Sequence, residues 1–116
     1  MLFRSREGEW SFIYFNGELS HVLLKRPAPN DYRAHGLYGG TVERGVPPAG
    51  YVEQADAILA TLPFELLYAR LDLITVADRL AVVEIEIIEP ILYFQVVPEA
   101  VQKLVRATQA RLGQPR

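Results

Sequence analysis

The chain has 116 residues, of which 50% are apolar and 22% are charged, and its formal net charge at pH 7 is −2. This length predicts one domain over residues 1–116, with flexible ends at 1–8 and 113–116. The sequence has no lysine or arginine run, no apolar run of membrane-spanning length, and no cysteine for disulfides or thiol chemistry. We therefore expect a cytoplasmic protein that binds neither nucleic acid nor membrane.

The first predicted element is a hairpin. Residues 10–15 are aromatic and strand-like, Asn16-Gly17 is typical of a tight two-residue turn, and residues 19–26 form the second strand. Simple alternation gives one shared face consisting of Trp10, Phe12, Tyr14, Leu19, His21 and Leu23. A histidine in such a place is more often a packed strand residue than a ligand or a base.

Residues 27–46 contain the breaks between regular elements. Proline and glycine flank the segment Asp31-Tyr32-Arg33 and the pair Gly39-Gly40. The cations Lys25, Arg26 and Arg33 cluster around the first break, which suits an anion site as well as an ordinary charged surface. Glycines allow close backbone approach to a ligand, but Gly39-Gly40 fits an ordinary loop equally well.

Two helices are predicted. The first follows Pro47-Pro48 and ends before Pro63, and the second begins at Pro98 and ends at Gly113. The apolar stripe of the second consists of Val101, Leu104, Val105 and Leu112. A hairpin precedes each helix, so we expect a two-layer α+β fold with a mostly antiparallel four-stranded sheet and both helices on one face.

The second hairpin, residues 68–90, organises the chain. Its two strands alternate between apolar and charged residues, and the polar turn around Ala77-Asp78-Arg79 joins them. Folding about Asp78 predicts three cross-strand pairs: Leu71 with Ile85, Leu73 with Val83, and Asp72 with Glu84.

Three carboxylates, those of Asp72, Glu84 and Glu86, share the polar face of this hairpin. Like charges directly opposite one another destabilise a sheet, so these acids favour a bound cation. Mg²⁺ with the phosphates of a nucleotide is one interpretation. The alternative is a solvated outer face whose charge is balanced by Arg70 and other cations.

Several short motifs follow one another in the first part of the chain: Gly8-Glu9-Trp10-Ser11, Phe15-Asn16-Gly17-Glu18-Leu19-Ser20-His21, Lys25-Arg26-Pro27, Asp31-Tyr32-Arg33 and Gly39-Gly40. Asp72 is then followed twelve positions later by Glu84 and fourteen later by Glu86. With these motifs the chain resembles the C-terminal half of ATP-grasp ligases, closest to the glutathione-synthetase-like and ribosomal-protein glutamate ligase branch.

The resemblance implies that Asp72, Glu84 and Glu86 hold the Mg²⁺ or Mn²⁺ ions that bridge the phosphates of ATP. In such ligases ATP phosphorylates a carboxylate, and an amine or thiol then attacks the acyl phosphate. Glu86 stands where the family usually has asparagine, which adds a negative charge to the metal site.

The resemblance also implies that Arg33, and secondarily Lys25, contact the transferred phosphate, and that Gly39 and Gly40 line the nucleotide site. It covers about residues 8–90 and leaves out the substrate domain, the lid strands and the hinge that holds adenine. We therefore expect part of a ligase, inactive alone, whose partners are a nucleotide-metal complex or the missing half. The alternative is a stand-alone, non-catalytic interaction module. An open sheet edge predicts self-association, foremost as a dimer.

Overall fold

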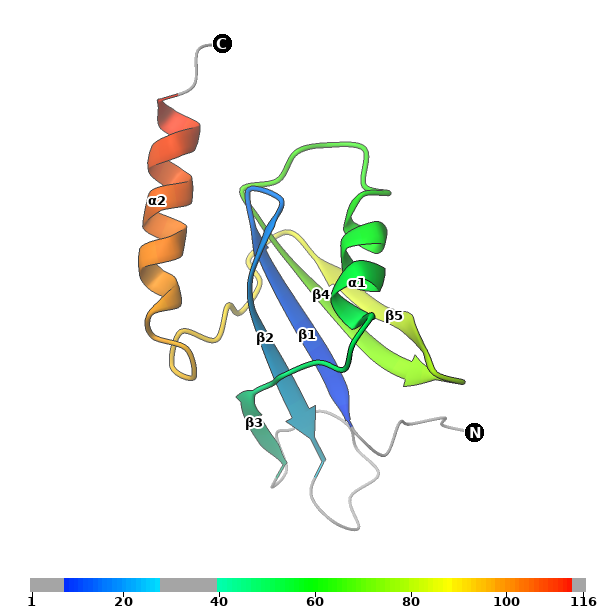
Figure 1. Cartoon of the computed structure of the whole chain (residues 1–116). Helices are drawn as coiled ribbons and strands as arrows, with labels where there is room; N and C mark the ends of the chain where they lie inside the picture. The colour runs from blue at the N-terminus through cyan, green and yellow to red at the C-terminus, as the bar shows by residue number, and fades with distance from the viewer. Residues whose placement is uncertain (1–7, 28–39, 114–116) are drawn as a thin grey trace.

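The computed structural model of the chain describes residues 8–27 and 40–113 and shows an α+β fold, as predicted (Figure 1). Along the chain the elements are β1 (Glu9–Phe15), β2 (Glu18–Arg26), β3 (Thr41–Arg44), α1 (Tyr51–Leu59), β4 (Tyr68–Val76), β5 (Arg79–Glu86) and α2 (Ala100–Leu112). No helix among these residues combines the length and the apolar content needed to cross a bilayer.

The sheet has five antiparallel strands in the order β3-β2-β1-β4-β5, one more than the sequence predicted. The additional strand, β3, pairs with the outer side of β2, and an ion pair between Arg26 and Glu43 joins the same two strands. Four residues are too few to show a recognisable hydrophobic period, so the sequence indicated only a break there. The aromatic strand β1 lies at the centre of the sheet, where it is buried on both faces.

The first hairpin has the predicted turn but a different register. Asn16 and Gly17 have φ angles of 50° and 79°, the left-handed conformation that a tight hairpin turn requires. The register shifts between Ile13 and Tyr14, so that His21 pairs with Ile13. The prediction that His21 and Leu23 lie on the aromatic face is therefore wrong, because a bulge moves every residue beyond it to the other face.

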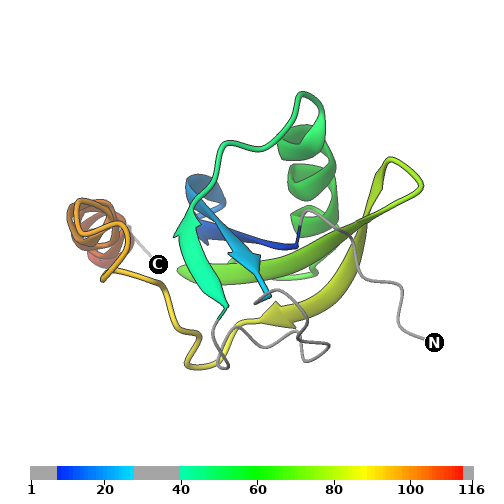
Figure 2. The ribbon, with the colours of Figure 1, turned by 90° about the horizontal axis from the view of Figure 1, so that it is seen from below.

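The two helices cover opposite faces of the sheet, and the expectation of a single covered face is wrong. On the first face, Tyr51 and Ala55 of α1 are buried against sheet residues that include Trp10, Phe12, Tyr14, Leu24 and Leu71. On the second face, Ala100 of α2 and Val97 of the connection before it are buried against Ile13, Phe15 and Leu23 of the sheet. Figure 2 shows the two helices well apart. α1 (green) lies above the sheet, and α2 (orange) lies to the left of the sheet.

The apolar stripe of α2 is only partly the predicted one. Leu104 packs toward the sheet, with Ala107 beside it, but Val101, Val105 and Leu112 are exposed. Leu112 retains 82% of its accessible surface. Two adjacent apolar stripes run along this helix, and periodicity alone does not tell which of them faces the sheet.

Candidate functional site

The second hairpin forms about the predicted turn. Ala77 and Asp78 have φ angles of 50° and 63°, so this is again a two-residue turn with both central residues left-handed. Leu71 pairs with Ile85 as expected, and both contribute to the core beneath α1. The other face of β4 and β5 therefore carries the polar residues.

A bulge lies directly beside the predicted metal ligands. Asp72 pairs with Glu84 as predicted, but the register then shifts and Leu73 pairs with Val82 rather than Val83. Val83 is 52% exposed, so it does not close the apolar face as the sequence predicted. Bulges redirect side chains and are common next to functional sites.

On the face opposite α1, charged and polar side chains from four strands gather around Asp72. We call this group, together with the ring of one tyrosine, the polar cluster. It consists of Glu9, Ser11, Lys25, Arg70, Asp72, Glu84 and Tyr93.

Asp72 is the buried centre of the polar cluster, with a side chain only 2% exposed. Arg70 binds it in a bidentate manner: Nε donates to Oδ1 and Nη2 to Oδ2, each at 3.0 Å. Ser11 Oγ donates to Oδ1 at 2.7 Å, and Lys25 Nζ lies 3.9 Å from the same oxygen. A buried carboxylate needs such partners, and here the chain supplies them itself.

Arg70 extends these contacts beyond Asp72. Its Nη1 donates to the carbonyl of Ile91 at 3.2 Å, its Nη2 lies 3.9 Å from Glu84 Oε2, and its Cζ lies 5.8 Å from the Tyr93 ring centroid. Burial alone would lower the pKa of Arg70, but the bonds to Asp72 outweigh it and the pKa is raised. The sequence interpretation treated Arg70 only as a balancing charge. Its spacing of two from Asp72 on a strand was the available signal, since such residues share a face.

Lys25 reaches the same place from β2. Its Nζ lies 3.1 Å from Glu9 Oε1 and 5.7 Å from the ring centroid of Tyr93, a residue with a left-handed φ of 61°. Burial opposes its charge, but Asp72 and Glu9 outweigh this effect and raise the pKa of Lys25. The cations of Lys25 and Arg70, from strands separated by β1, thus converge on Asp72 and on one aromatic ring. Both cations are paired with carboxylates of the chain itself, Lys25 with Glu9 and Asp72, and Arg70 with Asp72 and Glu84.

The predicted metal ligands share a face but do not form a metal cradle. Glu84 lies on the edge strand, where partial loss of solvent and the carboxylates of Glu86 and Asp72 raise its pKa. Within residues 8–27 and 40–113, no three acidic or histidine side chains converge on one position. Arg70 and Ser11 engage both oxygens of Asp72, so a divalent ion does not fit this arrangement. Ligation of Mg²⁺ by Asp72, Glu84 and Glu86 stays a prediction.

Two of the other predicted site residues, Arg33 and Gly39, lie outside the residues that the structure describes. Gly40 is described and immediately precedes β3. Of the predicted cationic residues, Lys25 is therefore the one placed in the polar cluster.

His21 is a packed strand residue with two hydrogen bonds. Its ring lies against Phe15 and Phe94, its Nδ1 is 2.7 Å from Ser20 Oγ, and its Nε2 is 2.8 Å from the carbonyl of Leu92. Burial lowers its pKa. This environment matches the structural role favoured by the sequence, and it ties the connection after β5 to the sheet.

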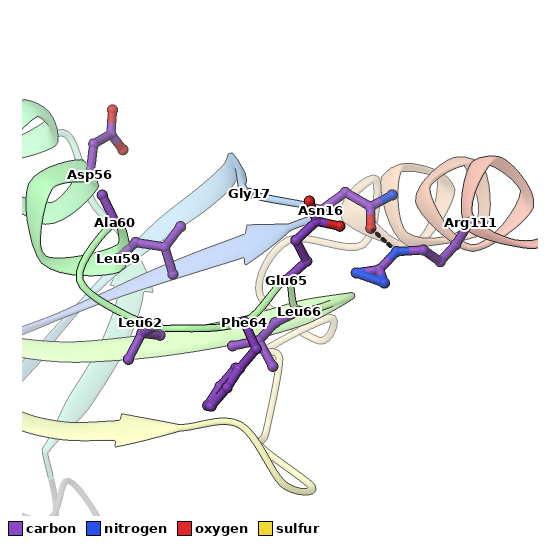
Figure 3. A pocket seen from close by; sticks show the side chains of 10 residues that line it. All are labelled: Asn16, Gly17, Asp56, Leu59, Ala60, Leu62, Phe64, Glu65, Leu66 and Arg111. Atoms are coloured by element: carbon purple, nitrogen blue, oxygen red, sulfur yellow. Dashed lines mark hydrogen bonds between the residues drawn. The ribbon is translucent and has the colours of Figure 1, made fainter. Parts of the chain in front are cut away.

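A groove of about 590 Å³ lies between the end of α1, residues 60–66 and the turn of the first hairpin (Figure 3). Its volume suits a small ligand. However, Asp56 accepts a bond from Tyr14 Oη at 2.7 Å, and Arg111 donates to Asn16 Oδ1 at 3.2 Å. Figure 3 shows Asp56 and Arg111 on opposite sides of the groove. Because its charged groups do not converge, we place the candidate site at the polar cluster.

No family model matches the chain, and no curated protein sequence matches it significantly. Among solved structures it is similar to D-cycloserine synthetase DcsG, with a TM-score of 0.71 and 25% identity over 92% of this chain and 39% of that chain. It is also similar to D-alanine–D-alanine ligase from Bacillus anthracis. The ATP complex of that ligase gives a TM-score of 0.62 at 18% identity, over 89% of this chain and 37% of the ligase. A second structure of the ligase gives 0.64 at 21%, over 89% and 38%.

These structural neighbours are ATP-grasp enzymes, so the chain has the fold of part of an ATP-grasp ligase. It spans about two fifths of the length of each of them. The narrower assignment to the glutathione-synthetase-like branch, and to the C-terminal half, stays a prediction.

Proposed function

We propose that the chain is the C-terminal, phosphate-binding part of an ATP-grasp ligase that joins a carboxylate to an amine or a thiol. We further propose that it belongs to the glutathione-synthetase-like branch and is inactive without the rest of the enzyme. The observation that carries the proposal is the convergence of Lys25 and Arg70 on one face of the sheet, in a fold shared with ATP-grasp ligases.

The two cations suit the polyphosphate of ATP in different ways. Arg70 uses Nε and one N–H of Nη2 on Asp72, so the second N–H of Nη2 and that of Nη1 are what it can offer to phosphate oxygens, whereas the Lys25 ammonium acts as a compact charge. Arg33 and the backbone at Gly39 and Gly40 are proposed to complete the phosphate site. Neutralising the charge on the transferring phosphoryl group is the main contribution that such residues make to catalysis.

The acids of the same face are proposed to serve the metal of the nucleotide. Glu84 and Glu86, on the edge strand, would hold Mg²⁺ or Mn²⁺. Asp72, the third predicted ligand, does not fit this role while Arg70 and Ser11 bond both of its oxygens. When bound by Glu84 and Glu86, the ion supplies positive charge to the phosphate oxygens. Glu86 replaces the asparagine that is usual in the family, so it adds a carboxylate. Carboxylate oxygens are ligands that a hard cation such as Mg²⁺ prefers.

Exposed apolar residues at the sheet edge support a second proposal, a stand-alone module that self-associates. Val82 and Val83 on β5 are about half exposed, and among the described strands β5 pairs with β4 alone. An edge strand with apolar side chains can pair with another chain. We propose a cytoplasmic homodimer formed through this edge, without nucleic-acid or membrane partners. Sedimentation across micromolar concentrations tests it, and a monomer throughout would contradict it.

Calorimetric titration of the whole chain tests the phosphate site. MgATP, Mg²⁺ alone and ATP alone are titrated into the unmodified chain and into Lys25→Met and Arg79→Met. We expect Lys25→Met to weaken MgATP binding by about tenfold or more, because it removes a half-buried cation from the cluster. Arg79→Met removes one charge of the same sign at the exposed start of β5, so it should leave the affinity within about twofold. A folded chain that takes up no MgATP would favour the interaction module instead.

A further inference from the structure

Ser20 and His21 are neighbours in β2, and their side chains meet. Ser20 Oγ lies 2.7 Å from His21 Nδ1. Successive residues of a regular strand point to opposite faces, so two neighbours do not normally form such a contact. Here Ser20 falls between the register pairs Ile13–His21 and Tyr14–Leu19, and it is therefore the extra residue of the bulge. The bulge turns the Ser20 side chain toward the ring of His21.

The hydrogen bonds of His21 fix which ring nitrogen carries the proton. Its Nε2 lies 2.8 Å from the carbonyl oxygen of Leu92. A carbonyl oxygen only accepts, so Nε2 carries the hydrogen and donates it. In the neutral ring Nδ1 is then the acceptor, and the Ser20 hydroxyl is the donor. A serine hydroxyl bonded to a basic ring nitrogen, in a ring held by a third group, is the arrangement of an activated nucleophile.

The surroundings of His21 keep its ring neutral and able to accept a proton. Burial lowers the pKa of His21, and this outweighs the opposite effect of the bond to Leu92, while the ammonium of Lys103 lowers the pKa further. His21 is buried, whereas Ser20 is half-buried. A substrate can therefore reach the serine while the base lies behind it.

Ser20 lines a groove of about 410 Å³ between α2 and the first hairpin. Apolar side chains such as Leu19 form part of the lining, and the volume suits a small ligand. The charged lining consists of Lys103 and Arg106 from α2 and Glu18 from β2. Because the cations outnumber the acid, the groove favours a ligand that carries a negative charge.

Lys103 is anchored beside the nucleophile. Its Nζ donates to the backbone carbonyl of Ser20 at 2.9 Å. An ammonium has three N–H donors, so two remain for an oxygen on which negative charge develops when the serine attacks a carbonyl. Arg106 lies on the exposed part of α2 that lines the same groove, so its guanidinium is available to an anionic group of the substrate.

We propose that Ser20 is a nucleophile, that His21 is its general base, and that the groove takes small carboxylic esters that carry a negative charge. Ser20 Oγ attacks the ester carbonyl as its proton passes to His21 Nδ1. The bond from the carbonyl carbon to the leaving alcohol then breaks as this proton passes to the alcohol oxygen. Water hydrolyses the acyl-serine by the same steps and releases the carboxylic acid. This activity does not rest on the proposed nucleotide site.

Ester hydrolysis by the whole chain tests the nucleophile and the base. The rate with 4-nitrophenyl hemisuccinate, a negatively charged ester, is measured for the unmodified chain, Ser20→Ala and His21→Gln. We expect each variant to lose about tenfold or more of the rate above that of buffer, because general base catalysis contributes at least this much. A rate in Ser20→Ala equal to that of the unmodified chain would overturn the inference.

The cations are tested by comparing a charged with a neutral ester. The unmodified chain should hydrolyse 4-nitrophenyl hemisuccinate faster than 4-nitrophenyl acetate, when each rate is divided by its rate in buffer. In Arg106→Met this preference should fall by about two- to fivefold, as expected for an exposed charge pair. The matched control Arg79→Met removes a cation from the start of β5 and should leave the preference unchanged. Equal preferences in Arg106→Met and Arg79→Met would overturn the selection of anionic esters by the groove.

A covalent label locates the nucleophile and needs no variant. The unmodified chain is treated with diisopropyl fluorophosphate, which forms a stable ester with activated serine hydroxyls, and its peptides are analysed by mass spectrometry. We expect the label on Ser20 and none on Ser11, which is buried and donates to Asp72. A chain whose Ser20 stays unlabelled would overturn the inference, whether or not the chain binds MgATP.

Discussion

Asn16 joins the turn of the first hairpin to α2. Its Oδ1 accepts a bond from Arg111 Nε at 3.2 Å, and its Nδ2 donates to the carbonyl of Ala107 at 2.9 Å. The same residue adopts the left-handed φ of 50° that the turn requires, a conformation that asparagine tolerates better than most residues. One side chain therefore holds the C-terminal half of α2 against the sheet.

Replacing Asn16 by glycine should loosen α2 while keeping the turn. Glycine adopts the same φ but loses both bonds, so we expect about 1–2 kcal/mol less stability and faster amide exchange within residues 104–112. The matched control is Gly17→Ala, which strains a φ of 79° without touching α2. It should cost about 1–2 kcal/mol with no selective effect on the helix. Equal amide exchange rates of α2 in the two variants would contradict the role of the Asn16 side chain in holding α2.

The Tyr14 hydroxyl should make stability fall at alkaline pH. Burial, together with the bond to Asp56, raises the pKa of Tyr14 above its ordinary value of 10.0. Above pH 10 the unfolded chain therefore loses this proton before the folded chain does, and the free energy of unfolding decreases. Tyr14→Phe should cost about 1–3 kcal/mol at pH 7. Urea unfolding measures the free energy of unfolding of both proteins, and the difference between them should shrink above pH 10. A difference that stays constant would show that ionisation of Tyr14 does not affect stability.

The alternation of apolar and polar residues, together with the turn residues, was enough to predict both hairpins, their turns and the pairing of Asp72 with Glu84. It failed where one strand carries an extra residue, because a bulge reverses the face of everything beyond it. His21 and Val83 were both misplaced for this reason. Nothing in a period of two reveals where such a shift occurs.

The sequence pointed to the acidic residues of the candidate site, but it pointed to only one of its two cations. Asp72, Glu84 and Lys25 stand out by spacing or motif, but the role of Arg70 depends on burial, which the sequence does not show. The ring of Tyr93 reaches the cluster through a left-handed residue in an irregular connection. Local propensity does not predict such a conformation for tyrosine.

Protonation of His21 should lower the stability of the fold at acidic pH. Burial, reinforced by Lys103 and Arg44, lowers the pKa of His21 below its ordinary value of 6.5. As the pH falls below 6.5 the unfolded chain takes up this proton first, so the free energy of unfolding drops. We expect His21→Gln to be about 1 kcal/mol less stable at pH 7.5. The stability difference between this variant and the unmodified chain should become smaller between about pH 6.5 and 5, the range in which an ordinary histidine gains charge. Parallel pH profiles for the two proteins would exclude His21 as the cause.

Removing one negative charge from the acidic face should have opposite effects at two positions. Asp72→Asn leaves the buried guanidinium of Arg70 without its carboxylate, so we expect about 3–5 kcal/mol less stability in metal-free buffer. Glu84→Gln removes an exposed carboxylate whose pKa is raised by partial loss of solvent and by its acidic neighbours, so stability at pH 7 should stay equal or rise.

Urea unfolding of both variants, in the absence of divalent ions, measures this contrast. The two substitutions alter the net charge equally, so a general charge effect predicts equal changes. A solvated outer face predicts that Asp72→Asn is neutral or stabilising, because it relieves repulsion. If Asp72→Asn proves neutral, the bonds between Asp72 and Arg70 do not contribute to the stability of the fold.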